Sequence, residues 1–161
     1  MNNILVIGGA GYIGSHVVLK LKKQGYNPII LDNLSTGNKE SVKNSVLYIS
    51  ELDNEETITT IIKKYNINCV MHFAAFIEVG ESVLNPIKYY YNNVVKVFNL
   101  LNILIKNNIK YFVFSSTAAT FGEPKKEKID EMHYQMPINT YGNTKLCVEK
   151  MLQDFEKSLR F

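Results

Sequence analysis

Short hydrophobic runs alternate along this chain with longer segments in which apolar residues recur every three or four positions. The runs have the length of β-strands and fall at residues 4–7, 28–31, 46–49, 69–73 and 111–114. Helical periodicity occupies residues 12–24, 54–65 and 86–106, more weakly 38–44, and a last segment from about Asn139 to the end. Strands that alternate with helices in this way predict an α/β fold.

Two of the predicted helices have recognisable ends. Gly25 directly follows the helix at 12–24, as expected where a helix stops in a left-handed residue. Asn85 and Pro86 open the helix at 86–106 and predict an N-cap followed by a proline in the first turn. The apolar stripe of that helix consists of Ile87, Tyr90, Val94, Val97, Leu101 and Leu104.

The strand-length runs are continuously hydrophobic, which is typical of strands covered on both faces of a parallel sheet. Joined by helical crossovers, they predict a doubly wound, Rossmann-like parallel sheet, and we treat residues 1–161 as one such domain. Sheets of this kind bind ligands beyond the carboxyl ends of their strands. Segments that contain small or polar residues follow every predicted strand, at 8–14, 32–33, 51–52, 74–75 and 115–117. One such residue is ordinary in a loop, but a group after every strand indicates a ligand site.

Three glycines, Gly8, Gly11 and Gly14, lie between the first predicted strand and the first predicted helix. In a dinucleotide-binding turn, such glycines permit the tight turn, the approach of the backbone to a pyrophosphate, and the packing of the helix on the strand. The positive end of the helix then faces the anion. A glycine-rich loop that serves only packing is the alternative. A nucleoside-triphosphate P-loop is excluded because Ser15 and His16 stand where Lys followed by Ser or Thr is required.

The choice of dinucleotide depends on Asp32, which ends the second predicted strand. A carboxylate at this place accepts hydrogen bonds from the adenosine ribose and repels a 2′-phosphate. The sequence therefore predicts NAD rather than NADP as the cofactor. The alternative is that Asp32 is an acidic residue of an ordinary turn, without a cofactor contact.

Tyr141 and Lys145 form a Tyr-x-x-x-Lys pair in the last predicted helix. Residues four apart share a helix face, so the phenol and the ammonium can converge. The ammonium would stabilise the phenolate and make the tyrosine an effective base near neutral pH. Thr117 offers a hydroxyl that can donate or accept as a substrate oxygen changes between alcohol and ketone. A core tyrosine beside a solvated lysine is the alternative, but together with the glycine motif we interpret all three residues as catalytic.

Composition narrows the class of protein further. The formal net charge is only +3 and the lysines are scattered, so no nucleic-acid partner is expected. Cys69 and Cys147 are far apart in sequence, so no metal site is expected, and unpaired thiols suit a reducing compartment. The longest apolar stretch, 94–105, is too short to cross a bilayer, so no membrane partner is expected. Because the N-terminus also lacks a signal-peptide pattern, we expect a cytoplasmic protein.

A set of motifs spread over the whole chain resembles those of the UDP-glucose 4-epimerases, a family of the extended short-chain dehydrogenases/reductases. The motifs are Gly-Gly-Ala-Gly-Tyr-Ile-Gly-Ser-His (8–16), Leu-Asp-Asn-Leu-Ser-Thr-Gly (31–37), His-Phe-Ala-Ala (72–75), Val-Gly-Glu-Ser-Val (79–83), Tyr-Tyr-Tyr-Asn-Asn-Val (89–94), Phe-Ser-Ser-Thr-Ala-Ala-Thr-Phe-Gly (114–122) and Tyr-Gly-Asn-Thr-Lys (141–145). The resemblance implies a UDP-sugar substrate and a tightly held NAD that is reduced and reoxidised in each cycle.

Specific roles follow from the resemblance alone. Tyr141 would take the proton of the sugar C4 hydroxyl while a hydride moves from C4 to the nicotinamide, and return of the hydride to the other face would interconvert UDP-glucose and UDP-galactose. Lys145 would assist the tyrosine and bind the nicotinamide ribose, and Thr117 would orient the C4 oxygen. Besides Gly8, Gly11, Gly14, Tyr141 and Lys145, the expected contacts to NAD are Tyr12, Ile13, Asp32, Asn33, Leu34, Ser35, Thr36, Gly37, Glu51, Leu52, Phe73, Ala74, Ala75, Phe76, Ile77 and Asn92.

The chain departs from the family pattern in informative ways. Related dehydratases and decarboxylases place an acid soon after the Ser/Thr, whereas here Ala118 and Ala119 follow Thr117, which favours epimerisation. Glu51 stands where an aspartate usually meets the adenine, and Ile77 where some epimerases have a lysine. Epimerases are also about twice as long, so the resemblance implies that the nucleotide-sugar domain is absent after the Tyr-x-x-x-Lys helix and that these residues alone grip the sugar poorly.

Several hypotheses therefore remain open. The leading one is the N-terminal portion of an NAD-dependent UDP-glucose 4-epimerase. The others are a catalytically impaired NAD-binding fragment or module, another nucleotide-sugar epimerase of the family, and a short-chain dehydrogenase acting on a free alcohol. In enzymes that this chain resembles, the helices corresponding to 86–106 and to the Tyr141 segment form a dimer bundle, so a homodimer is a possible assembly.

Overall fold

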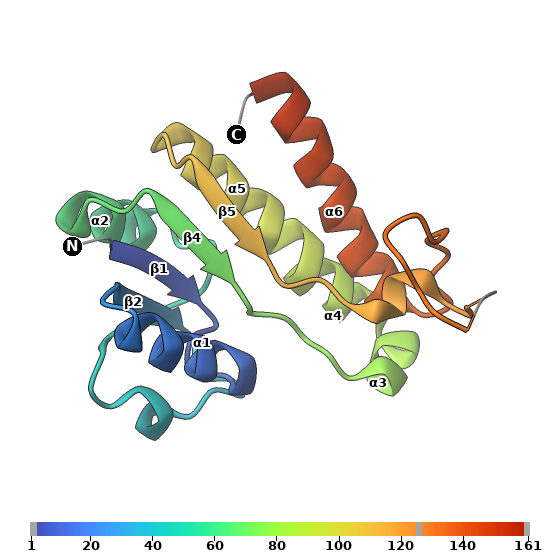
Figure 1. Cartoon of the computed structure of the whole chain (residues 1–161), viewed down its shortest axis with the longest axis horizontal. Coiled ribbons are helices and arrows are strands. Elements are labelled where there is room, and N and C mark those ends of the chain that lie inside the picture. Colours follow the sequence, from blue (N-terminus) through green and yellow to red (C-terminus); the bar gives the residue numbers. More distant parts are fainter. Residues whose placement is uncertain (1–2, 125–126, 160–161) are drawn as a thin grey trace. The chain divides into compact units, whose positions relative to one another are not determined.

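The computed structural model describes residues 3–124 and 127–159, which divide into two compact units (Figure 1). The first unit contains residues up to Ala74 together with Asn99–Ser115, and the second contains Ala75–Phe98 and the residues from Ser116 onward. Within the described ranges, no helix is long and apolar enough to cross a membrane.

The first unit is built on one sheet of five parallel strands in the order β3-β2-β1-β4-β5. The strands are β1 (Asn3–Ile7), β2 (Asn27–Asp32), β3 (Val46–Ile49), β4 (Cys69–His72) and β5 (Tyr111–Phe114). All five hydrophobic runs are thus strands, with ends within one residue of the predicted ones. The predicted Rossmann-like parallel sheet is confirmed, and the order of the strands changes direction between β1 and β4, where such sheets bind their ligands.

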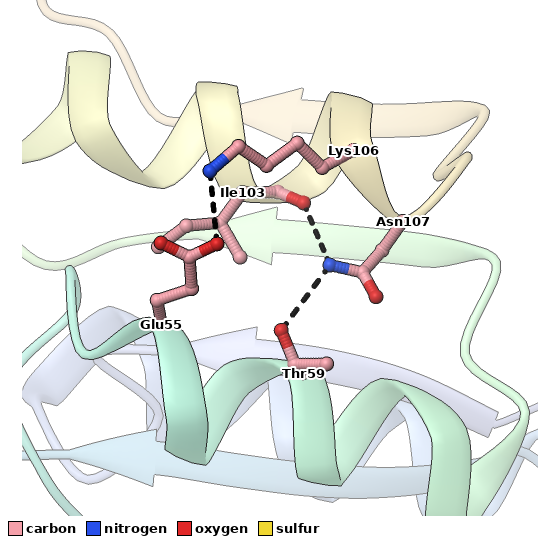
Figure 2. A network of polar contacts seen from close by, with 5 residues as sticks. All are labelled: Glu55, Thr59, Ile103, Lys106 and Asn107. Atoms are coloured by element: carbon pink, nitrogen blue, oxygen red, sulfur yellow. Dashed lines mark hydrogen bonds and ion pairs between the residues drawn. The ribbon is translucent and has the colours of Figure 1, made fainter.

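Helices of this unit cover both faces of the sheet. Helix α1 (Tyr12–Lys23) packs Val18 and Leu21 against Ile4 and Val6 of β1. Leu5, between them in sequence, points to the opposite face and is fully buried. That face carries α2 (Glu55–Tyr65) and the 99–106 part of α5 (Lys96–Lys106), as Figures 1 and 2 show. Burial on both faces explains why the strands read as unbroken hydrophobic runs.

Local sequence signals set the ends of these helices. The helix predicted at 54–65 is α2, with the Asn54 side chain accepting a hydrogen bond from Thr57 N. Gly25 follows α1 in a left-handed conformation, as predicted. The weak pattern near 38–44 forms only the short 3₁₀ helix η1 (Lys39–Val42), whose first turn is closed by Asn38.

A polar network joins the two helices on this face (Figure 2). Lys106 Nζ lies 2.9 Å from Glu55 Oε1 in an exposed ion pair. Asn107 Nδ2 donates to Thr59 Oγ1 at 3.3 Å and to Ile103 O at 2.9 Å, so one amide closes the end of α5 and contacts α2. Because these groups are exposed or half-buried, burial of apolar side chains contributes more to holding α2.

The single helix predicted at 86–106 is three segments. α4 (Pro86–Tyr90) leads into the π-helical turn η2 (Tyr91–Val95), which continues as α5. Pro86 occupies the first turn of α4 as predicted, but the predicted Asn85 cap is not made through the Asn85 side chain. π-helical turns are rare and often occur at functional sites.

The remaining elements of the second unit include two that the periodicity did not predict. They are the six-residue helix α3 (Val79–Leu84) and the 3₁₀ helix η3 (Ala118–Phe121). The predicted last helix is α6 (Thr140–Leu159), with Asn139 as its cap: the Asn139 side chain accepts from Gly142 N at 2.8 Å. Glu81 of α3 accepts from the phenol of buried Tyr89 at 2.9 Å and so fixes α3 to α4.

Two substitutions on α2 test which interaction holds it. Ile58→Ala removes a side chain that is 0% exposed and is expected to lower the free energy of unfolding by about 2–5 kcal/mol. Glu55→Gln removes one partner of the exposed ion pair and is expected to cost less than about 1 kcal/mol. Urea unfolding measures both, and equal losses would contradict this assignment.

Candidate functional site

The glycine turn of the first unit has a geometry that only glycine satisfies at two places. Gly8 has a φ of +75°, and a Cβ on it would lie 2.4 Å from Ala74 N. A Cβ on Gly14 would lie 2.1 Å from Gly8 O. The tight turn after β1 and the close packing of α1 on that turn therefore both depend on the absence of a side chain.

Gly11 differs from these two glycines. Among the described residues, the only atom within 4 Å of a Cβ built on Gly11 is Gly8 O, at an ordinary contact distance of 3.4 Å. Packing within the chain thus leaves space for a side chain at Gly11. Gly11 is also the N-cap of α1, and within the described part of the chain no side chain caps that helix end. Space and free N–H groups at a helix N-terminus fit the phosphates of a dinucleotide.

Asp32 is placed to shape this turn. It is 8% exposed, and its two carboxylate oxygens accept hydrogen bonds from Ala10 N at 2.9 Å and Leu34 N at 2.8 Å. Each oxygen keeps a second lone pair. The structure therefore gives Asp32 a role that the sequence reading did not foresee, the joining of the glycine turn to the loop after β2, and its contact with a ribose stays a prediction.

The loop after β2 is held by side chains that were predicted to contact the cofactor. Asn33 Nδ2 donates to Glu51 Oε1 at 3.0 Å, and Asn33 Oδ1 accepts from Ser35 N. Leu34 has a φ of +58°, and Leu52 is buried. Thr36 and Gly37 lie on the same loop. Glu51, expected at the adenine, orders this loop, and its contact with adenine also stays a prediction.

The segment after β4 continues the line of predicted cofactor contacts. Phe73 N donates to Ile7 O at 2.8 Å, so the chain after β4 stays paired with the last residue of β1. The next residue, Ala74, supplies the backbone atom that a Cβ on Gly8 would meet. Phe73 and Ala74 belong to the first unit, whereas Ala75, Phe76 and Ile77 belong to the second. Ile77 is 60% exposed.

In the second unit, the buried amide of Asn93 joins three segments. It accepts from Phe76 N and donates to Phe76 O, both at 2.9 Å. It also accepts from Asn92 Nδ2 at 2.9 Å and donates to Thr144 Oγ1 at 3.3 Å. Every hydrogen-bonding position of this amide is used. From the π-turn, the Asn93 side chain thus bonds to the backbone of Phe76 and to Thr144 of α6, and the neighbouring Asn92 side chain bonds to it.

The first turn of α6 places Tyr141. Its backbone N–H donates to Ser82 Oγ of α3 at 3.1 Å, and its carbonyl accepts from Thr144 Oγ1 at 2.7 Å. The hydroxyl of Ser82 is fully buried and donates in turn to Val79 O. Tyr141 itself is half-buried. Its backbone is thus fixed by two hydroxyls while its side chain keeps access to solvent.

Thr117 lies at the start of η3, which packs closely on α6. A Cβ on Gly142 would lie 2.6 Å from Ala119 O, so the helix and the turn touch without a side chain between them. Thr117 Oγ1 accepts from Ala119 N at 3.2 Å. The predicted catalytic hydroxyl therefore belongs to a turn that contacts α6 at the residue after Tyr141.

Lys145 is buried, only 3% exposed, one helical turn after Tyr141. Burial lowers the pKa of its ammonium from the ordinary value to about 8, and the nearby Glu149 carboxylate acts in the opposite direction. A buried lysine on the same face as a tyrosine is the arrangement that the Tyr-x-x-x-Lys spacing predicts.

Ser82, Asn93 and Gly142 were not singled out by the sequence reading. Each acts through backbone contacts with a residue of a distant segment, which no local spacing reveals. A polar side chain inside a predicted apolar helix, as with Asn93, is the one signal that could have drawn attention to such a residue.

The strand order, the glycine turn with space at Gly11 and the Tyr141–Lys145 face together define a Rossmann-like α/β protein suited to a dinucleotide cofactor. The chain belongs to the NAD dependent epimerase/dehydratase family, whose model matches residues 4–161. This confirms the family that the motifs indicated.

Individual relatives are epimerases. The chain is 47% identical to UDP-glucose 4-epimerase of Rhizobium meliloti over 96% of its own length and 47% of that protein. It matches the crystal structure of UDP-glucose 4-epimerase from Brucella ovis in complex with NAD, with a TM-score of 0.95 and 42% identity over 98% of this chain and 49% of that one. It also matches the UDP-Glc/GlcNAc 4-epimerase from Campylobacter jejuni, with a TM-score of 0.93 and 37% identity over 99% of this chain and 50% of that one. The chain thus spans about half the length of the curated relatives that it matches.

The lowered pKa of Lys145 predicts a pH dependence of stability. Between about pH 8 and the ordinary lysine pKa of 10.5, the folded chain has lost this proton and the unfolded chain has kept it, so stability rises with pH across this window. Below pH 8 both states are protonated and the full desolvation penalty, on the order of 3 kcal/mol, applies.

Comparison with Lys145→Met isolates this contribution. From pH 7 to pH 10, the native chain should gain up to about 3 kcal/mol of unfolding free energy relative to Lys145→Met. Denaturant titrations at a series of pH values measure it. A difference that stays constant with pH would show that Lys145 is not desolvated in the folded chain.

Proposed function

We propose that this chain is the NAD-binding and catalytic portion of a UDP-sugar 4-epimerase that interconverts UDP-glucose and UDP-galactose. The observation that carries the proposal is the buried Lys145 one helical turn from Tyr141, in a chain that matches the NAD dependent epimerase/dehydratase family over residues 4–161. Curated relatives with this match are UDP-glucose 4-epimerases, which supports the choice of reaction.

The catalytic roles follow from the chemistry of a C4 epimerisation. Tyr141 removes the proton from the C4 hydroxyl, and its half-buried phenol leaves room for a substrate oxygen. Lys145 places a positive charge one helical turn from the phenol that takes the proton, and in a buried site that charge acts at lower dielectric. Thr117 donates to the C4 oxygen while it is a ketone. Bound NAD would supply the reversible hydride chemistry of this reaction.

NAD binding is proposed for the glycine turn and the loops after the strands. Backbone N–H groups of Tyr12 and Ile13 bind the pyrophosphate at the start of α1, and Gly11, whose own N–H donates to Gly8 O, leaves the space for it. Asp32 binds the adenosine ribose through its remaining lone pairs, which favours NAD over NADP. The other proposed contacts are Gly8, Gly14, Asn33, Leu34, Ser35, Thr36, Gly37, Glu51, Leu52, Phe73, Ala74, Ala75, Phe76, Ile77, Asn92, Tyr141 and Lys145.

A non-enzymatic NAD-binding module is the second candidate, because the rigid glycine turn and the space at Gly11 serve cofactor binding without any catalytic step. Such a module would bind the cofactor without converting a sugar. A relative named as a probable UDP-arabinose 4-epimerase, from Arabidopsis thaliana, shows in addition that similar chains are assigned other UDP-sugars. Conversion of UDP-galactose at rates of ~1 s⁻¹ or more by these residues alone would exclude the module.

Assembly and cellular role belong to the same proposal. Ile87, Tyr91, Val95 and Phe98 recur along one helical stripe, and all four are 44–82% exposed. A stripe of exposed apolar side chains favours a protein partner, and we propose a homodimer through it. A cytoplasmic enzyme of galactose metabolism is consistent with the reaction proposed.

Gly11→Ala tests NAD binding without disturbing the fold. Its Cβ has only one ordinary contact within the described residues and would occupy the space proposed for a phosphate. We expect the dissociation constant for NAD, measured by calorimetry, to rise at least about tenfold with little change in melting temperature. Gly80→Ala, also with open space around its Cβ, is the matched control and should bind NAD normally. Unchanged NAD affinity in Gly11→Ala would reject the proposed site.

Tyr141→Phe tests the proposed base. The assay uses a chimera in which this chain replaces the matching N-terminal part of the Rhizobium meliloti enzyme. Loss of the phenolic hydroxyl should lower kcat for UDP-galactose by about 10²- to 10⁴-fold with little effect on NAD binding. Tyr134→Phe, which removes an exposed hydroxyl of the same unit, is the control. Equal activity of the two variants would contradict the role of Tyr141.

A further inference from the structure

Glu149 of α6 is not among the residues assigned to the reaction, yet two other segments of the second unit are bonded to it. The hydroxyl of Ser116 donates to Glu149 Oε1. The amide of Gln135 donates to Glu149 Oε2 at 2.7 Å. Gln135 Nε2 also lies 3.3 Å from Thr120 Oγ1, so the same amide contacts η3. Both oxygens of one carboxylate thus tie the segments on either side of η3 to α6.

Ser116 directly precedes Thr117, whose hydroxyl is proposed to contact the substrate. Thr117 is extended, with φ −152° and ψ 148°, and its backbone carbonyl accepts from Thr120 Oγ1 at 2.9 Å. The position of the Thr117 hydroxyl relative to α6 therefore depends on what holds its two flanks. One flank is Ser116, held by Glu149, and the other is the close contact of Ala119 with Gly142.

Glu149 also stands one helical turn after Lys145, as Lys145 stands one turn after Tyr141. A buried ammonium is unfavourable unless an opposite charge accompanies it. Glu149 is half-buried and is the carboxylate whose attraction acts on Lys145. The three side chains follow one another on one face of the helix, in the order phenol, ammonium, carboxylate.

We propose that Glu149 is a positioning residue of the reaction: it fixes Ser116, and through it the Thr117 hydroxyl, against α6, and it supplies the negative charge that accompanies the buried Lys145 ammonium. This inference rests on the proposed function only for the roles of Thr117 and Lys145. The placement itself is a property of this chain and can be measured without cofactor or substrate.

The first test measures the charge. In the chain of 161 residues, the Lys145 side chain is titrated by NMR of its ¹³Cε resonance, identified by its loss in Lys145→Arg. Glu149→Gln keeps the size of the side chain and removes its charge, and should lower the midpoint of the Lys145 titration by about one pH unit. Glu149→Asp keeps the charge and should restore a midpoint close to that of the native chain. A purely structural role would leave the midpoint unchanged in Glu149→Gln, and that result would overturn the proposal.

The second test measures the placement of Thr117. Hydrogen exchange of the amides in 117–122 reports on η3, because Ala119 N donates to Thr117 Oγ1 and Thr120 N to Thr117 O. Glu149→Ala should speed exchange in this segment about tenfold, as expected for the loss of bonds to a charged acceptor. Ser116→Ala should speed the same segment and leave the Lys145 titration near its native midpoint. Native exchange of 117–122 in Glu149→Ala would refute the placement.

Glu156→Gln is the matched control, since it removes a carboxylate from an exposed position two turns further along α6. It should leave both readouts at their native values, and a shift equal to that of Glu149→Gln would contradict a specific role of Glu149. Neither the Lys145 titration nor the exchange of 117–122 needs NAD or a sugar. If the native chain did not bind NAD while the Glu149 variants showed both effects, that result would count against the proposed function and not against the placement by Glu149.

Discussion

The burial of the Lys145 ammonium is the constraint on which the second unit depends. At 3% exposure the group has given up nearly all of its hydration, and a charge in that position is tolerated only when the surrounding chain compensates it. The compensating charge comes from Glu149, and further hydrogen bonds order the residues packed about α6. Glu149 accepts bonds from two other segments while its charge acts on Lys145, and Ser82 and Thr144 fix the backbone at Tyr141. A buried ammonium is hard to explain by stability alone, because an apolar residue would pack there at less cost.

The first unit has a different character, since its candidate site is made of backbone. At Gly8 and Gly14 the structure has no room for a side chain. The two carboxylate oxygens of Asp32 each accept a hydrogen bond from a backbone N–H, one in the glycine turn and one in the loop after β2. Of the three glycines Gly8, Gly11 and Gly14, Gly11 alone has space that no part of the described chain fills. The rigid turn and the unfilled space together are what a bound diphosphate requires, because a preformed site does not lose binding free energy in ordering itself.

The strands were the most predictable part of the structure. Burial on both faces demands unbroken hydrophobic runs, so each run located a strand to within one residue. The glycine turn and the Tyr141–Lys145 face were predictable because their chemistry depends on short spacings. Helix α3 was missed because six residues hold too little periodicity, and it is fixed by the contact of Glu81 with Tyr89. Gly142, likewise, looks like an unfavourable helix residue until the partner at Ala119 is known.

The π-turn at Tyr91–Val95 carries a consequence for how this segment can change over evolution. A π-turn accommodates one residue more than an α-helical turn, and that surplus is what brings the Asn93 amide level with Phe76 and Thr144. Deleting any one residue there would restore a uniform α-helix and turn the preceding residues by about 100° around its axis. Many side-chain replacements on the outer surface would leave the amide in place, whereas a single-codon deletion would remove all of its bonds at once. In this stretch of the chain, a change of length is therefore more damaging than a change of an outward-facing side chain.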